Sequence, residues 1–199
     1  WIHANTSDHS WQEKVRAKNP DIIIHAAWQI RNLHFNPKKQ WLWNVTGSKD
    51  IFDFTFSLPS VDRLIYFSTA SIFGAFPNNE IDELFDAEAP LKDEEYLYAK
   101  EKKIVEEDLR ARRERGETGD IEISIIRPAA ITGPRGRFAR IRFGLQSALS
   151  GNLEGSIAYT FVKMLTSVVP ATEKWCRQFI HEDDITNIVT ILTFKGAPN

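Results

Sequence analysis

The sequence has 199 residues, of which 42% are hydrophobic, and a formal net charge of −2. A chain of this size can bury a substantial core and fits one domain, or one domain with a small lobe. The near-balanced charge gives no basis for binding nucleic acid or a membrane surface by bulk electrostatics, and no apolar run approaches the ~20 residues that span a bilayer. The single cysteine, Cys176, excludes an internal disulfide and suits a reducing compartment, so we expect a cytoplasmic protein.

Helix and strand patterns alternate along the chain, which is typical of a parallel sheet covered on both faces. The fold class that we predict is therefore α/β. The expected elements, in chain order, are a helix over 10–18, a buried strand over 22–27, a helix over 41–58, a strand over 64–68, a long loop over 75–94, a helix over 95–115, a strand over 121–126, a mixed segment over 135–175, and a helix from its N-cap Asp184 to about 192.

The pair Tyr96 and Lys100 is the strongest candidate for chemistry. A tyrosine and a lysine four residues apart on a helix share one face, so the ammonium can assist proton transfer by the phenol. A free tyrosine titrates near ~10, so such transfer at neutral pH also benefits from a hydroxyl partner. Thr69, at the end of an apolar strand, supplies that hydroxyl.

The ends of the expected strands should meet at one crevice. In open parallel sheets ligands bind beyond the carboxyl ends of the strands. We therefore expect Ala26-Ala27, Ser68-Thr69 and Arg127-Pro128 to converge there, with the helix that carries Tyr96 and Lys100 at the border.

Other conspicuous residues favour structural interpretations. Tyr98 lies two residues off the Lys100 face and is expected to pack or to line a rim. His25 follows three isoleucines in a buried strand, which favours a hydrogen-bonded core histidine over a general base. The run from His181 to Asp184 has metal-ligand residue types, but capping is favoured and we expect no metal site. Trp28 packs in the core or lines the substrate pocket.

Six motifs in one order resemble the extended branch of the short-chain dehydrogenase/reductase superfamily, the NAD-dependent epimerase/dehydratase family. One of the six is the Tyr-x-x-x-Lys pair described above. The other five are His25-Ala26-Ala27 after a strand, Asn44-Val45-Thr46-Gly47-Ser48, the strand and turn from Arg63 to Gly74, Ile126-Arg127-Pro128 with Gly133-Pro134, and Phe179-Ile180-His181-Glu182-Asp183-Asp184.

The resemblance implies a Rossmann-like doubly wound parallel sheet with a small substrate-side lobe. Residues 1–134 and 176–195 would form the dinucleotide-binding core, and 135–175 the substrate-side segment. Tyr96 would transfer the proton, Thr69 would position the substrate hydroxyl, and Lys100 would hold the nicotinamide ribose, supported by Asn44. The other residues expected to contact the cofactor, NAD or NADP with NAD favoured, are Asn5, Ala26, Ala27, Ser68, Arg127 and Pro128, and those expected to contact substrate are Trp28, Ser71 and Ala130.

One family motif is missing. Family members open with a strand and a Gly-x-x-Gly-x-x-Gly turn that lets the backbone approach the cofactor pyrophosphate, and none of the ten glycines here falls in that arrangement. Trp1 to Asn5 resembles the family's third strand. We therefore interpret the chain as a portion of a longer protein, with the N-terminal βαβ unit absent.

The departures from the family pattern limit the choice of substrate. Ala130 replaces the asparagine common in nucleotide-sugar epimerases, and Ala70-Ser71 replaces the Asp-Glu of the dehydratases, so dehydration is not expected. The first hypothesis is an epimerase or oxidoreductase acting on a nucleotide sugar. The alternatives are a reductase of a non-sugar carbonyl compound and, in another class, a non-catalytic dinucleotide-binding regulator. The resemblance also implies a homodimer formed through helices 38–58 and 95–115.

Overall fold

A computed structural model of the protein describes residues 1–30, 32–33, 35–74, 76, 79–80, 82, 84–92, 96–135 and 178–195. The expected segment 135–175 lies almost wholly outside the described residues. The chain divides into two compact units, one of 1–129 with 185–199 and one of 130–184. Residues 130–134, which we expected in the core, thus belong to the second unit. No described helix is long and apolar enough to cross a membrane.

The first unit is built on a three-stranded parallel sheet. Its strands are β1 (Ile22–His25), β2 (Arg63–Phe67) and β3 (Glu122–Ile126), in the order β1-β2-β3. Ile24 of β1 lies opposite Ile65 of β2, and Ile65 lies opposite Ser124 of β3. Leu64, Ile65 and Tyr66 of the central strand are fully buried. This burial explains why the strands are mostly continuous apolar runs rather than alternating ones.

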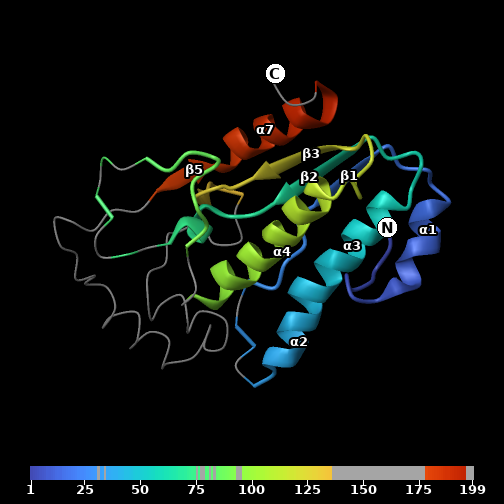
Figure 1. The fold of residues 1–199 in the computed structure, drawn as a ribbon, viewed down its shortest axis with the longest axis horizontal. Coiled ribbons are helices and arrows are strands. Elements are labelled where there is room, and N and C mark those ends of the chain that lie inside the picture. The colour runs from blue at the N-terminus through green and yellow to red at the C-terminus, as the bar shows by residue number, and fades with distance from the viewer. Residues whose placement is uncertain are drawn as a thin grey trace. The chain divides into compact units, whose positions relative to one another are not determined.

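Helices connect the strands and cover the sheet. Between β1 and β2 the chain forms α2 (Pro37–Trp41), the π-helical turn η2 (Leu42–Thr46) and α3 (Gly47–Phe56), and between β2 and β3 it forms α4 (Leu97–Glu114). α3 and α4 run side by side on one face of the sheet, and α7 (Glu182–Phe194) runs along the other face (Figure 1). The Nη1 of Arg63, the first residue of β2, donates to the Thr193 carbonyl of α7 at 2.6 Å.

The core of this unit lies between the sheet and the α3–α4 layer. Phe52 of α3, Tyr66 of β2, and Val105 and Leu109 of α4 are buried together. The rings of Phe52 and Tyr66 meet edge to face with centroids 5.5 Å apart, a favoured aromatic geometry. The residues on α4 that face this core fix the rotation of that helix, and so they decide which of its polar side chains reach the sheet.

Smaller elements complete the described chain. α1 (Gln12–Arg16) follows the short helix η1 (His9–Trp11), and β4 (Ala130–Thr132) pairs with β5 (Phe179–His181) in the second unit. The 3-10 helix η3 (Ala70–Phe73) follows β2 and ends at Gly74, whose φ of 83° favours glycine.

Several expected boundaries are wrong. Residues 1–5 form no strand, and the expected helix 41–58 is three helical segments that begin at Pro37. α7 begins at Glu182, so Asp184 lies inside its first turn instead of capping it. Three acidic residues in that turn suit the positive end of the helix dipole. The parallel α/β fold class itself is confirmed, since helices cover both faces of the sheet.

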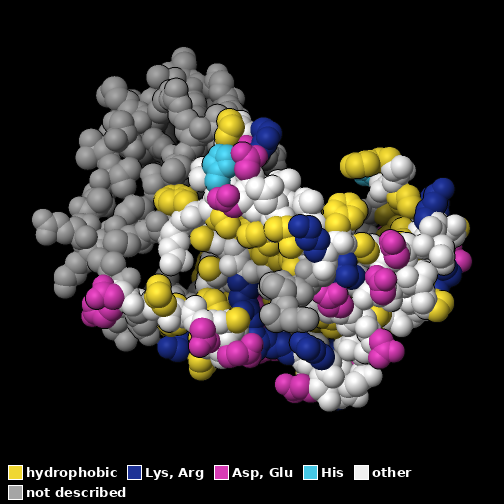
Figure 2. Space-filling view, turned by 90° about the horizontal axis from the view of Figure 1, so that it is seen from above, with side chains coloured by type: hydrophobic (Ala, Val, Ile, Leu, Met, Phe, Trp, Pro, Cys, Tyr) yellow, Lys and Arg dark blue, Asp and Glu magenta, His cyan; other side chains and the backbone are white. Residues whose placement is uncertain are grey.

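Hydrophobic side chains gather on the face of the molecule over α7 (Figure 2). Ile188, Ile191 and Phe194 of α7 are exposed there, whereas Ile185 is buried.

Candidate active site

The carboxyl ends of the three parallel strands meet at one edge of the sheet. The Ser68 amide donates to the Ile126 carbonyl at 2.8 Å, and the Ala70 amide donates to the Pro128 carbonyl at 3.0 Å, so the segments that leave β2 and β3 stay paired beyond the strands. Ala26 and Ala27, which follow β1, are exposed. This edge therefore offers small side chains beside the hydroxyls of Ser68 and Thr69.

Lys102 of α4 points into this edge and is buried. Its Nζ donates to the carbonyl of Phe67, the last residue of β2, at 2.5 Å. The same atom lies 3.7 Å from the centroid of the Trp28 ring and 5.0 Å from that of Tyr66. Burial lowers the pKa of Lys102 to about 7, and the negative charge of Glu106 opposes this shift.

Tyr98 lies one helical turn before Lys102 on α4, and its side chain is partly buried. Burial raises the pKa of Tyr98 above its ordinary value, while the side-chain hydrogen bond with Thr69 lowers it. The Tyr98 ring meets the Trp28 ring edge to face, with centroids 6.4 Å apart. A hydroxyl, a phenol and an ammonium thus gather at the end of β2, contributed by Thr69, Tyr98 and Lys102.

The expected pair Tyr96 and Lys100 does not occupy this place. Tyr96 is 51% exposed and Lys100 is exposed. Tyr96 has the extended backbone of an N-cap, φ −82° and ψ 106°, and α4 begins only at Leu97. The pair Tyr98 and Lys102, and not Tyr96 and Lys100, therefore has its lysine buried at the end of β2.

The sequence contained a signal for the second pair. Tyr98 and Lys102 have the same four-residue spacing. The buried residues of α4 recur at helical spacing as Ala99, Lys102, Glu106 and Leu109. The face marked by the apolar Ala99 and Leu109 contains Lys102, whereas Lys100 falls outside it.

Asn44 supports a loop rather than Lys100. Its Oδ1 accepts from the Gln29 amide at 2.8 Å, and its Nδ2 donates to the Gln29 carbonyl at 3.0 Å and to Glu101 at 2.7 Å. Gln40 donates to both oxygens of Glu101 at 3.2 and 3.1 Å and accepts from the Leu33 amide at 2.8 Å. This buried group of Gln40, Asn44 and Glu101, hereafter the amide clamp, holds the segment that carries Trp28.

His25 is a buried, hydrogen-bonded histidine, as predicted. Its Nε2 lies 2.8 Å from the Ser48 hydroxyl, which donates to the Asn44 carbonyl at 2.5 Å. Because the hydroxyl proton of Ser48 is used in that bond, we assign the Nε2 as the donor to Ser48. Burial lowers the pKa of His25 to about 3, and the nearby Lys102 contributes in the same direction.

Gly47 of the Asn-Val-Thr-Gly-Ser motif allows two segments to approach closely. A Cβ at this position would lie 2.4 Å from the Thr6 hydroxyl oxygen. Thr6 in turn donates to the Trp43 carbonyl at 2.9 Å. Asn5, expected to bind cofactor, uses its Oδ1 within this segment to accept from the Ser7 amide and hydroxyl at 3.1 and 2.9 Å.

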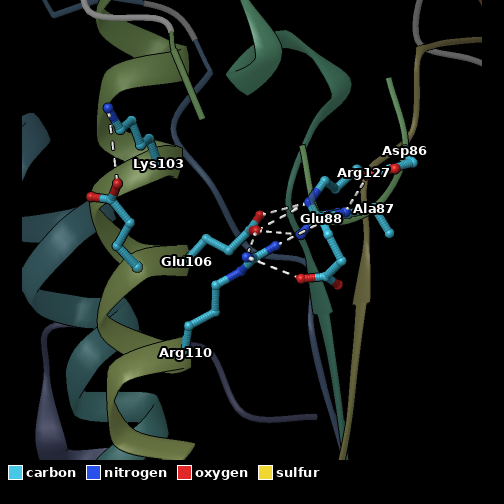
Figure 3. A network of polar contacts seen from close by, with 8 residues as sticks. Asp86, Ala87, Glu88, Lys103, Glu106, Arg110 and Arg127 are labelled. Carbon is cyan, nitrogen blue, oxygen red and sulfur yellow. Dashed lines mark hydrogen bonds and ion pairs between the residues drawn. The ribbon is translucent and has the colours of Figure 1, made fainter. Parts of the chain in front are cut away.

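Arg127, also expected to bind cofactor, instead holds the loop after β2. Its guanidinium donates to Glu106 at 2.6 to 3.1 Å and to the Ala87 carbonyl at 2.9 Å. Arg110 approaches the other side of Glu106, with its Nε 3.2 Å from Oε1 (Figure 3). The Arg127 guanidinium is thus engaged within the protein, and its contact with the cofactor stays a prediction.

The residues expected to contact substrate lie in different elements. Trp28 is partly buried on Lys102. Ser71 begins the turn after Thr69, where its amide donates to the Thr69 hydroxyl oxygen at 3.2 Å. Ala130 lies in β4 of the second unit.

A parallel sheet whose strand ends meet a Tyr-x-x-x-Lys helix defines a Rossmann-like protein. The chain belongs to the NAD dependent epimerase/dehydratase family, whose model matches residues 1–197. No curated protein matches the sequence.

Solved structures share this fold. The chain is similar to the enzyme WbmG of Bordetella bronchiseptica in complex with NAD, with 21% identity and a TM-score of 0.62 over 100% of this chain and 55% of that one. It is similar to the UDP-glucose 4-epimerase of Thermus thermophilus in complex with NAD, with 17% identity and a TM-score of 0.69 over 96% and 59%. It is similar to the dTDP-glucose 4,6-dehydratase of Bacillus anthracis in complex with NAD, with 15% identity and a TM-score of 0.68 over 98% and 55%. The chain therefore spans little more than half the length of these relatives.

Proposed function

We propose that the protein is an NAD-dependent epimerase or oxidoreductase that moves a hydride and a proton at a carbinol carbon, with a nucleotide sugar as the first choice of substrate. The observation that carries the proposal is the burial of Lys102 at the end of β2, one helical turn from Tyr98, where its Nζ bonds Phe67, two residues before Thr69. Thr69, Tyr98 and Lys102 take the roles that we first assigned to Thr69, Tyr96 and Lys100.

The strand ends fit a dinucleotide. Ala26 and Ala27 are small and exposed, so they leave room for a flat ring or a ribose. The Ser68 hydroxyl is buried and has no hydrogen-bond partner among the described residues. A buried hydroxyl without a partner is unfavourable, which supports a ligand at this edge. NAD is favoured over NADP because the relatives of known structure named above were solved with NAD.

Lys102 can hold the ribose of such a cofactor. An ammonium has three donors, and one of them is used by the Phe67 carbonyl. The remaining donors suit hydroxyl oxygens. NAD, when bound, would accept or return the hydride. Lys102 would bind and orient it.

Tyr98 is suited to donate a proton in the reducing direction. Because burial raises its pKa, the phenol is protonated at neutral pH. It can then transfer that proton to an oxygen that gains negative charge as the hydride arrives. Thr69 lowers the pKa of Tyr98 against the effect of burial, which favours the phenolate that remains.

A WbmG complex contains UDP in addition to NAD, which favours a nucleotide sugar. A reductase of a non-sugar carbonyl compound is the second candidate, because the aromatic Trp28 lies beside Tyr98 and Lys102. A non-catalytic dinucleotide-binding regulator is disfavoured, since a complete Thr-Tyr-Lys set would then serve no reaction.

Two matched variants test the proposal. Tyr98→Phe should still bind NAD, as measured by cofactor fluorescence. It should no longer turn over any member of a panel of UDP- and dTDP-sugars. Tyr96→Phe, the same substitution two residues away, should retain both. Turnover that survives Tyr98→Phe, or is lost only in Tyr96→Phe, would refute the site. Turnover of simple ketones but not of sugars would favour the reductase.

We further propose a homodimer through the helices within 38–58 and 95–115. Trp41 and Leu42, at the junction of α2 and η2, are exposed apolar residues that a partner could cover. Size-exclusion chromatography with light scattering would give a dimer mass, and Trp41→Glu would reduce it to that of a monomer. A monomeric wild-type protein would contradict this proposal.

A further inference from the structure

Lys102 is surrounded mainly by aromatic rings. Its Nζ faces the Trp28 ring at 3.7 Å and the Tyr66 ring at 5.0 Å, and it donates to the Phe67 carbonyl. Lys102 forms no salt bridge in the part of the chain that the structure describes. Glu106, one helical turn after Lys102 on α4, is engaged by Arg127 and Arg110. The ammonium is therefore held by a carbonyl and ring faces instead of a carboxylate.

The contacts that hold the Trp28 indole are made by its aromatic ring and not by its N–H. A buried tryptophan usually finds an acceptor for its N–H. Here the Nε1 is buried and has no partner among the residues described. The ring instead covers Lys102 with its face and meets Tyr98 edge to face. This arrangement leaves an N–H without a partner, which is costly unless the contact with the ammonium compensates.

The backbone next to Trp28 is fixed by the amide clamp. Asn44 bonds both the amide and the carbonyl of Gln29. Glu101, which receives the Nδ2 of Asn44, directly precedes Lys102 on α4. Asn44 thus joins Gln29, the residue after Trp28, to Glu101, the residue before Lys102. This link fixes the position of the indole relative to the ammonium.

We propose that Trp28 is a positioning residue for Lys102, whose indole face keeps the buried ammonium charged and directed at the cofactor ribose. This inference rests on the proposed function for its purpose, but the contact itself can be tested separately. An ammonium attracted by a ring face is more stable as a cation than one buried against aliphatic carbon. Without the indole face, burial alone would favour the neutral amine.

The other groups that face Lys102 do not replace this contact. Glu106 on α4 raises the pKa of Lys102, while His25 on β1 stays neutral because its own pKa is about 3. Tyr66 on β2 and Tyr98 on α4 both have raised pKa values through burial and are uncharged at neutral pH. Among these groups only Glu106 carries a charge at neutral pH. A change in the pKa of Lys102 after substitution of Trp28 can therefore be attributed to the loss of the indole.

The test measures the titration of Lys102 by NMR of the protein labelled with 13C-lysine, with Lys102→Arg used to assign the resonance. Trp28→Leu keeps an apolar side chain without a ring, and should lower the pKa of Lys102 by about one unit. Trp28→Phe keeps a ring face and should retain most of the wild-type value. If Trp28→Leu does not fold, Trp28→Met is the second ringless variant.

A packing role alone predicts a different result. If Trp28 only fills space, the Leu and Phe variants would show the same Lys102 titration, and this outcome would overturn the proposal. The affinity for NAD is then measured on the same variants. We expect it to weaken about fivefold in Trp28→Leu and less than about twofold in Trp28→Phe.

The two readouts separate this inference from the proposed function. If the protein binds NAD but Lys102 titrates identically in Trp28→Leu and Trp28→Phe, the role of Trp28 is refuted and the proposed function stands. A ring-dependent titration in a protein that binds no NAD would refute the proposed function, and with it the purpose assigned to Trp28.

Discussion

Glu106→Gln removes the charge that joins α4 to Arg127 while keeping the shape of the side chain. Glu106 is fully buried, and it accepts from Arg127 at 2.6 Å and from Arg110 at 3.2 Å. The Arg127 side chain is only 12% exposed, so its guanidinium would be left buried without a counter-charge. Arg110 is 32% exposed and can turn to water.

The expected loss of stability follows from this difference in burial. Breaking a buried ion pair by neutralising one partner costs roughly 3–5 kcal/mol. The Arg110 contact, which solvent screens, adds little to this. Since the remaining amide oxygen still accepts one hydrogen bond, we expect about 3 kcal/mol. At roughly 2–4 °C per kcal/mol for a chain of this size, the midpoint of thermal unfolding should fall by about 6–12 °C.

Urea unfolding followed by far-UV circular dichroism measures this loss, and Glu107→Gln on the next residue is the matched control. Glu107 is 52% exposed and lies 3.9 Å from Lys103, so its neutralisation should change the free energy of unfolding by less than about 0.5 kcal/mol. Equal effects of the two substitutions would refute the reasoning. The double variant Glu106→Leu, Arg127→Leu should recover much of the loss, because it leaves no buried charge behind and Arg110 can turn to water.

Two further predictions follow from the buried polar groups. Burial lowers the pKa of His25 in the folded protein to about 3, against an ordinary 6.5. As the pH falls from 6.5 toward 3, the unfolded chain therefore binds a proton at His25 that the folded protein does not, and the free energy of unfolding decreases. By about pH 5 the loss should be about 2 kcal/mol. Unfolding in urea at about pH 7.5 and about pH 5 measures it, and in His25→Gln this component should vanish, whereas an unchanged acid sensitivity would contradict the assignment. Asn44→Ala should remove the acceptor of the Gln29 amide and so increase the hydrogen-exchange rate of that amide about tenfold, since losing a buried hydrogen bond costs about 1–3 kcal/mol. Exchange followed by NMR decides this, with the Leu33 amide as the control because it is held by Gln40 instead, and a protected Gln29 amide would show that the amide clamp does not hold this loop.

Much of the fold could be predicted because its signals are local. The apolar run at Ile22–His25 and the helical pattern over Leu97–Glu114 depend on neighbours in sequence, and both elements form. Gly47 could be identified as part of a motif from the sequence. The physical reason for a glycine there is the close approach of Thr6, which comes from a distant segment. The role of Arg127 was missed because its partner Glu106 lies on another element.

The sequence by itself determined that a tyrosine and a lysine would lie four residues apart on a helix beside Thr69. It offered two such pairs, offset by two residues, and spacing alone cannot choose between them. Two residues turn an α-helix by about 200°, so the pairs lie on nearly opposite faces. Only the tertiary structure decided, because packing Ala99, Val105 and Leu109 against the sheet turns Lys102 inward and leaves Lys100 in solvent.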